Sequence, residues 1–144
     1  MRDNLTREGE IGEMKVELDL TQRGFVVSVP RTASTNGYDL LADPDGSRII
    51  KIQVKSVKKN ENGTITVPLI NRKNSSVAKN NRGQTHRYST LVDYIAVPVK
   101  NTNHIFYIPT NILPTNKTSE TFLLPEYVGR SKKTKLGAEF RQIA

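Results

Sequence analysis

Residues 37–56, with the sequence GYDLLADPDGSRIIKIQVKS, decide the fold of this chain of 144 residues. Residues 44–47 (PDGS) are rich in turn formers, and Gly46 suits the positive φ that a reversal of the chain requires. The residues after the turn alternate in polarity, with Ile50, Ile52 and Val54 on one face and Lys51, Gln53 and Lys55 on the other. The stretch therefore predicts a β-hairpin closed by the turn at residues 44–47.

The hairpin brings polar side chains together at one end of a small sheet. Gln53 and Lys55 are neighbours on one strand face, roughly 6.5 to 7 Å apart at about 3.3 Å per residue. Pairing of the two strands lays this face beside Asp39. A carboxylate, an amide oxygen and an ammonium group then converge, a combination suited to binding Mg²⁺ and phosphate. The alternative interpretation makes Asp39 a turn-capping acid and Lys55 a solvent-facing lysine.

The composition limits the class of protein. The length predicts a single domain spanning residues 1–144. The absence of cysteine excludes disulfides, thiolate metal sites and cysteine nucleophiles. No run approaches the roughly eighteen apolar residues of a membrane span, and the N-terminus has no apolar segment typical of a secretory signal. The sequence therefore predicts a soluble, cytoplasmic protein with no membrane partner.

The charge is strongly segregated along the chain. The net charge is +8, and residues 48–87 carry ten basic residues against one acid, whereas residues 1–20 carry three basic residues against six acids. Such segregation predicts binding of nucleic acid, and a basic solvated surface without a partner is the alternative. Residues 71–87 are expected to form a loop or a poorly packed helix, as a flexible insert or a DNA-contacting element. Residues 128–144 are expected to form a basic, partly mobile tail.

Residues 6–22 predict a helix that carries a row of acids. Its expected apolar face consists of Ile11, Met14 or Lys15, and Leu18. The spacing also places Glu10, Glu13 and Glu17 together on a neighbouring face. Most such rows are solvated surface, but three carboxylates in line repel one another, and a nearby cation would relieve that repulsion.

Several further strands are predicted from short apolar, β-branched runs. The expected strands are residues 25–29, 64–69, 93–99, 105–108 and 122–124. The pair Asn62-Gly63 predicts a hairpin turn between the strand of Lys55 and the strand 64–69. One helix and these strands together indicate an α/β domain.

The residues around Asp39 resemble a known nuclease signature. Asp39, followed fourteen residues later by Gln53-x-Lys55, is similar to the PD-(D/E)xK motif, with Tyr38 where proline often stands and Gln53 in place of the second acid. The helix with Glu13 and the run 23–27 resemble the first helix and strand of Holliday-junction resolvases and group I intron homing endonucleases of this superfamily. Residues 88–98 and 106–109 resemble the homing branch, so the likeness spans residues 9–113.

This resemblance implies a fold, a reaction and a site. The implied fold is a restriction-endonuclease-like core, a mixed central β-sheet flanked by α-helices. The implied reaction is Mg²⁺- or Mn²⁺-dependent hydrolysis of DNA. The implied catalytic residues are Glu13, Asp39, Gln53 and Lys55. Glu13 is preferred because it stands eleven residues before Gly24, a spacing similar to that of the resolvase-like nucleases, and Glu10 and Glu17 remain substitutes.

Each residue of the implied site has an expected role. The metal ligands are Asp39, Gln53, the backbone carbonyl of Val54, and Glu13 directly or through water. Lys55 would position or deprotonate the attacking water, or offset transition-state charge. Gln53 carries no charge, so the site is expected to hold metal more weakly than one with two acids.

The function expected from these observations is that of a homing-type double-strand DNA endonuclease. A Holliday junction resolvase is the second interpretation, and a non-catalytic basic nucleic-acid-binding module is the third. The partners would be double-stranded or branched DNA and further copies of the chain in a dimer or tetramer. The residues expected to contact DNA are Arg31, Lys58, Lys59, Arg72, Lys73, Lys79, Arg82, Arg87, Lys132 and Lys133.

Overall fold

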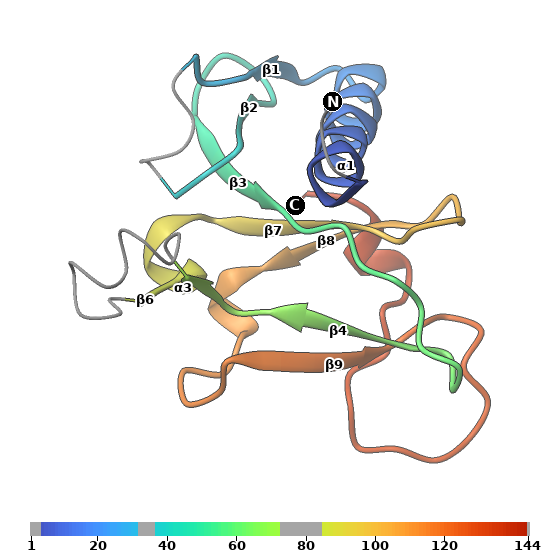
Figure 1. Cartoon of the computed structure of the whole chain (residues 1–144). Coiled ribbons are helices and arrows are strands. Elements are labelled where there is room, and N and C mark those ends of the chain that lie inside the picture. Colours follow the sequence, from blue (N-terminus) through green and yellow to red (C-terminus); the bar gives the residue numbers. More distant parts are fainter. Residues whose placement is uncertain (1–3, 32–36, 73–84, 144) are drawn as a thin grey trace.

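The computed structural model describes residues 4–31, 37–72 and 85–143, and Figure 1 shows the course of the chain. In chain order its elements are α1 (Asn4–Gln22), β1 (Val26–Ser28), β2 (Leu40–Asp43), β3 (Ile50–Val54), β4 (Thr64–Pro68), β5 (Ile70–Arg72), β6 (Thr85–Arg87), α3 (Tyr88–Leu91), β7 (Tyr94–Pro98), β8 (Ile105–Pro109), the 3₁₀ turn η2 (Thr110–Ile112), β9 (Ser119–Leu123) and the 3₁₀ turn η3 (Ala138–Arg141). Within the described ranges, no helix combines the length and apolar character that crossing a bilayer requires.

The central sheet has five strands in the order β1-β2-β3-β7-β8. β3 and β7 run parallel, and the other neighbouring pairs are antiparallel, so the sheet is mixed. The β2–β3 hairpin predicted from residues 37–56 is confirmed, with Leu40 opposite Ile52 and Ala42 opposite Ile50. Its turn contains Gly46 at φ 82°, a conformation that glycine adopts without steric cost. The predicted hairpin therefore sets the centre of the fold.

Two apolar clusters pack against opposite faces of this sheet. On one face, Val16 and Leu20 of α1 contact a cluster that includes Ile52 and Val54 of β3. On the other face, residues of β7 and β8 pack with the two-stranded β4–β9 ribbon. Figure 1 shows α1 and this ribbon on opposite sides of the central strands. The predicted mixed α/β, restriction-endonuclease-like class is confirmed, although a β-ribbon and the short α3 take the place of a second long helix.

The prediction for the apolar face of α1 is wrong. Ile11, Met14 and Leu18 are 41%, 58% and 59% exposed, whereas Val16 and Leu20 are completely buried. The helix lies against the sheet along the line of residues 12, 16 and 20, spaced by four. Because residue 12 is a glycine, this line shows only two apolar side chains in the sequence. The prediction therefore followed the more regular apolar row of Ile11, Met14 and Leu18, which is exposed in the structure.

The predicted hairpin between the Lys55 strand and residues 64–69 is also wrong. A turn does form, because the amide of Gly63 donates to the carbonyl of Asn60 at 3.1 Å. However, β4 pairs with β9 and not with β3. The reason is that β3 already has β2 on one side and β7 on the other, so no edge of β3 is free for β4.

The two basic segments contain more regular structure than the sequence predicts. The ends of residues 71–87, expected to be loop or helix, pair instead as β5 and β6, because strand pairing uses main-chain groups and needs few apolar residues. Residues 73–84 between them lie outside the described part of the chain. In residues 128–144, Leu136 is completely buried in the core and Phe140 packs against it. The mobility expected for part of this tail stays a prediction.

Candidate active site

Asp39 lies directly before β2, opposite the end of β3. Its amide donates to the carbonyl of Ile52 at 2.8 Å, which continues the pairing of the hairpin by one residue. Its Oδ2 accepts hydrogen bonds from Gln53 Nε2 at 2.8 Å and from the backbone N–H of Val54 at 2.9 Å. The structure thus brings together Asp39 and Gln53 as the hairpin predicted, and it fixes the orientation of the Asp39 carboxylate with two donors.

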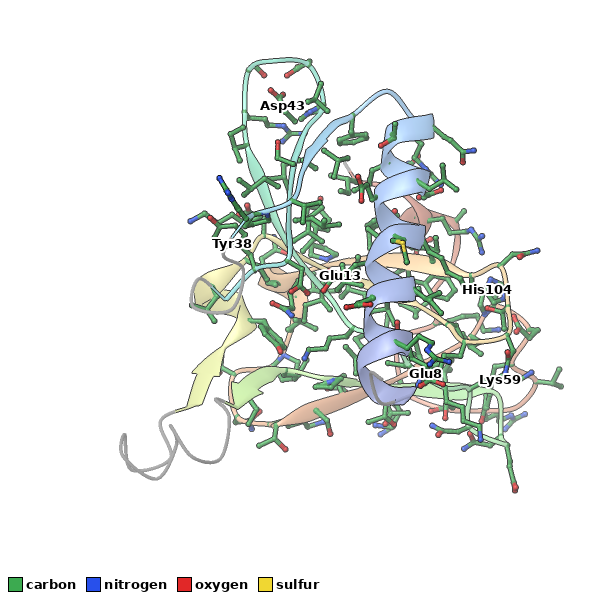
Figure 2. All side chains as sticks on the ribbon, turned by 45° about the horizontal axis from the view of Figure 1, so that its top comes forward. Glu8, Glu13, Tyr38, Asp43, Lys59 and His104 are labelled. Carbon is green, nitrogen blue, oxygen red and sulfur yellow. The ribbon has the colours of Figure 1, made fainter. Side chains whose placement is uncertain are left out.

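Glu13 meets this carboxylate from the helix. Figure 2 shows Glu13 on the side of α1 that faces the strands. The pKa of Glu13 is raised to about 7, chiefly by burial, then by the charges of Asp39 and Glu10 and by a side-chain hydrogen bond with Asp39. Among the described residues, the helix acid in hydrogen-bond contact with Asp39 is thus Glu13. This contact favours Glu13 over Glu10 and Glu17, and its role at the site stays a prediction.

Asp39 responds to opposing influences. Burial raises the pKa of its carboxyl, while the hydrogen bond from the Val54 amide, the charge of Lys55 and the hydrogen bond with Glu13 act to lower it. Two carboxyl groups in contact cannot both ionise without repulsion, so the Glu13–Asp39 pair retains a proton until the pH rises to about 7. The two carboxyl groups therefore form a position that favours a positive charge, and a proton occupies this position while the pair is protonated.

The approach of Glu13 depends on the residue beside it. A Cβ on Gly12 would collide with the Oγ of Ser56 and would lie 3.2 Å from the Cγ of Pro98. Glycine at this position thus lets α1 lie against the ends of β3 and β7. Sequence reasoning missed Gly12, and the available signal was a glycine inside a helix, which costs about 1 kcal/mol relative to alanine and so indicates a packing reason.

Ion pairs and hydrogen bonds hold both halves of α1 in place. Near its start, Lys100 Nζ lies 2.6 Å from Glu8 Oε2. Near its end, the Tyr107 hydroxyl donates to Asp19 Oδ2 at 2.5 Å, and Asp19 also pairs with Arg23 at 3.1 Å. Glu13 lies between these two attachments, so its position relative to the sheet is fixed from both sides.

Lys55 lies just past the end of β3, on the same side as Gln53. Its amide donates to the carbonyl of Ala96 at 2.9 Å, and its Nζ lies 5.4 Å from the centroid of the Tyr88 ring. The charge of Lys55 is one of the influences that lower the pKa of Asp39, so the ammonium group is near the acids. The structure therefore assembles Glu13, Asp39, Gln53 and Lys55 in one place, and their catalytic roles stay predictions.

The donor set of this place suits a hard divalent cation. The described residues contain no group of three or more His, Cys, Asp or Glu side chains able to hold a metal. Mg²⁺, however, is commonly held by one or two carboxylates with waters and substrate phosphates completing its coordination. Two carboxylates that share a proton match that need, so Glu13 and Asp39 fit Mg²⁺ or Mn²⁺. Gln53 presents its amide nitrogen to Asp39, and ligation by its oxygen or by the Val54 carbonyl stays a prediction.

The residues expected to contact DNA are widely spread. Arg31, Lys58, Lys59, Lys132 and Lys133 are exposed, and Lys133 also lies 3.6 Å from Glu120. Figure 2 shows Lys59 well separated from Tyr38 and Glu13, toward the start of α1. Lys73, Lys79 and Arg82 lie outside the described residues, as do the side chains of Arg72 and Arg87. The DNA-contacting role of all ten residues stays a prediction.

Comparison with known proteins bears on this geometry. The chain is similar to the solved structure of I-Ssp6803I, a bacterial homing endonuclease, with 18% identity over 90% of this chain and 84% of that one and a TM-score of 0.69. It is also similar to the Holliday junction resolvase Hjc of the archaeal hyperthermophile Archaeoglobus fulgidus, with 15% identity, 79% and 82% coverage and a TM-score of 0.47. No curated protein sequence matches the chain. The sequence pattern of the PD-(D/E)XK endonucleases matches residues 4–143, and the chain belongs to this endonuclease family.

Proposed function

We propose that this endonuclease hydrolyses phosphodiester bonds in double-stranded DNA with the help of Mg²⁺ or Mn²⁺, as a homing-type enzyme. The observation that carries the proposal is the contact between Glu13 and Asp39 beside the ammonium group of Lys55. Two acids that share a proton next to a fixed cation are costly to the fold, and such arrangements concentrate at functional sites. Membership of the endonuclease family supplies the reaction class.

Each residue contributes a separate part of the chemistry. Gln53 Nε2 and the Val54 amide hold Asp39 in one orientation, and Glu13 gives up its proton as the pH rises through about 7. Both carboxylates would then hold the cation, which supplies charge neutralisation on the phosphate and acidifies a bound water. Lys55 would place its ammonium group against the phosphate oxygens or the attacking water, where positive charge stabilises the transition state.

The homing type is supported by likeness and not by a site feature. I-Ssp6803I, the bacterial homing endonuclease described above, shares the fold over 90% of this chain. Residues 88–98 and 106–109 also resemble that branch. Cutting both strands of a duplex requires two centres, so we further propose that the chain acts as a dimer or tetramer. Light scattering on the purified protein at several concentrations tests the oligomeric state.

The function is tested by metal-dependent nicking of supercoiled plasmid. Lys55→Ala is expected to reduce the cleavage rate by about 100-fold or more, the usual effect of losing one charge-stabilising group. Lys51→Ala is the matched control, because Lys51 lies on the same strand face and its Nζ is 5.7 Å from the ring of Tyr38. The control is expected to cut within about threefold of the parent. Binding of DNA without any Mg²⁺- or Mn²⁺-dependent cleavage would instead support a non-catalytic binding module.

A second comparison separates the homing type from the resolvase. A linear duplex pool and an immobile four-way junction are offered at equal concentration in one reaction. The homing type is expected to make double-strand breaks at a site in the duplex and to ignore the junction. Paired cuts confined to the junction would overturn the homing assignment and leave the endonuclease assignment intact.

A further inference from the structure

We infer that Tyr88 is a positioning residue for Lys55, and that its ring face determines where the ammonium group stands in the site. The inference rests on the proposed function, because it concerns the lysine to which that function assigns transition-state contact. The observation behind it is the distance of 5.4 Å between Lys55 Nζ and the centroid of the Tyr88 ring. An ammonium group within about 6 Å of a ring centroid is attracted by the negative face of the ring.

The ring of Tyr88 is held firmly by the fold. Tyr88 is completely buried in the core cluster that also contains Leu69 and Val92. Its amide donates to the carbonyl of Leu69 at 3.1 Å, and its carbonyl accepts from the amide of Val92 at 2.9 Å. A side chain packed on all sides keeps one rotamer, so it presents a fixed surface to its neighbours.

The hydroxyl of Tyr88 does not explain the presence of a tyrosine here. It is buried, and among the described residues it has no hydrogen-bond partner. Buried polar groups in folded proteins are usually paired, because leaving one unpaired costs free energy. Lys55 Nζ lies over the face of the ring, so we expect phenylalanine to preserve the contact.

Lys55 needs such a surface because its side chain is long. The hydrogen bond from the Lys55 amide to Ala96 fixes the backbone, but four rotatable bonds separate the ammonium group from it. The group also lies near Asp39, whose charge attracts it. Without the ring, the ammonium group is free to move onto the Asp39 carboxylate and away from a phosphate. The ring thus selects the position from which Lys55 serves the reaction.

The same strand contains a matched pair for comparison. Lys51 stands over the ring of Tyr38 at 5.7 Å, two strand repeats away on the same face. Tyr38 is half-buried, and it packs only at the margin of the core. Replacing Tyr38 therefore removes an equivalent ring from a lysine that has no proposed catalytic role.

The first test is structural and needs no cleavage. Proton NMR of the full-length chain, without metal or DNA, follows the ε-methylene protons of Lys55, which are assigned by their loss in Lys55→Arg. We expect these protons to be shifted upfield by the ring current and to show nuclear Overhauser contacts to the Tyr88 ring. Tyr88→Phe should retain both signals, and Tyr38→Leu should change the Lys51 protons only. Lys55 protons at the positions of exposed lysines in the parent chain would overturn the inference, even if Tyr88→Leu does not fold.

The second test links the ring to the reaction. Tyr88→Leu is expected to lower kcat for plasmid nicking by about 100-fold with little change in KM, since misplacement of a reacting group by about 1 Å has effects of that size. Tyr88→Phe is expected to restore kcat. If the parent shows no Mg²⁺- or Mn²⁺-dependent cleavage, the proposed function fails while the NMR result still stands. If the parent cuts and Lys55→Ala cuts as fast, the catalytic role of Lys55 fails, and the positioning role of Tyr88 fails with it. If Lys55→Ala is inactive and folded Tyr88→Leu cuts at the parent rate, the positioning role fails alone.

Discussion

The two ends of β2 carry acids in contrasting surroundings. At the start of the strand, Asp39 is buried, its pKa is raised by that burial, and it contacts a second carboxyl from α1. At the other end, Asp45 in the turn is fully exposed, and hydrogen bonds from the side chain and the backbone of Ser47 lower its pKa. Figure 2 shows the hairpin tip near Asp43 far from Glu13. The same residue type therefore accepts hydrogen bonds within the turn at one end of the strand and forms a buried pair with a second acid at the other.

What separates the two ends is the helix. The turn acids accept N–H groups of their own loop, with Asp43 Oδ1 receiving the amides of Asp45 at 3.1 Å and of Gly46 at 2.6 Å. The hydrogen bonds from Ser47 stabilise the ionised carboxylate of Asp45 in water. Asp39 also accepts an amide, but α1 excludes water from it and adds another acid. Under the proposed function, binding of the cation would recover the free-energy cost of that arrangement, and the start of β2 would be the functional end of the strand.

The largest expected effect comes from exchanging one acid at each end for its amide. Asp39→Asn should reduce metal-dependent nicking by at least about 100-fold, because one ligand charge beside the phosphate is lost. Asp45→Asn should cut within about twofold of the parent. Initial rates at saturating Mg²⁺ measure both. Equal losses in the two variants would remove the distinction between the ends.

The next prediction tests whether the close approach of α1 creates the functional end. Gly12→Ala should destabilise the fold by about 1 to 3 kcal/mol, because the added methyl collides with Ser56. Gly9→Ala is the matched control on the same helix, since nothing lies within 4 Å of its added methyl, and it should stabilise by up to about 1 kcal/mol. Urea unfolding measures both changes.

A rescue variant sharpens the Gly12 experiment. Adding Ser56→Ala to Gly12→Ala removes the hydroxyl that the new methyl meets, so part of the lost stability should return. A Gly12→Ala protein as stable and as active as the parent would show that α1 can shift without consequence. The position of Glu13 would then not depend on this contact.

A third prediction concerns pH and the Glu13–Asp39 pair. The pKa of Glu13 is raised from 4.5 to about 7 in the fold, so the unfolded chain loses this proton at lower pH than the folded chain. The contribution of Glu13 to stability is therefore present below about pH 4.5 and is lost as the pH rises to about 7. Glu13→Gln, measured without metal, should gain stability relative to the parent between pH 5 and 8.

The stability that Mg²⁺ adds to the parent should increase with pH, whereas the stability of the metal-free parent decreases. A cation must displace the proton of the pair, so Mg²⁺ should raise the unfolding midpoint more at pH 8 than at pH 6. Glu13→Gln should lose most of this difference. A parent whose response to Mg²⁺ is the same at both pH values would contradict the shared proton.

The smallest expected effect lies at the turn. Asp43→Ala should lower the free energy of unfolding by about 1 kcal/mol, because the amides of Asp45 and Gly46 lose their acceptor. Its cleavage rate should equal that of the parent, since the turn lies away from the acid pair. A loss of cleavage larger than the loss of stability explains would assign the turn to the DNA interface.

The parts of the structure that could be predicted from the sequence are those determined by residues close to one another along the chain. The β2–β3 hairpin followed from turn formers and alternation within twenty residues, and with it came the approach of Asp39 to Gln53. The place of Glu13 came from resemblance, because no local pattern distinguishes it from Glu10 and Glu17. The buried line of α1 was hidden because Gly12 contributes no side chain, and the partner of β4 depends on strands distant in sequence.

The parallel pairing of β3 with β7 has a consequence for how the enzyme forms. The hairpin joins strands separated by one turn, whereas Asp93, which accepts the amide of Lys51 at 2.9 Å, lies 42 residues further along the chain. Closing so long a loop loses chain entropy before the stabilising contacts between the strands can form, so such pairings form slowly. Tyr88 belongs to the connection between β3 and β7. A newly synthesised chain can therefore form the hairpin that contains Asp39 before the ring of Tyr88 packs against Lys55. The nuclease would then become competent only when folding is complete, and a partly folded chain in the cell would leave DNA uncut.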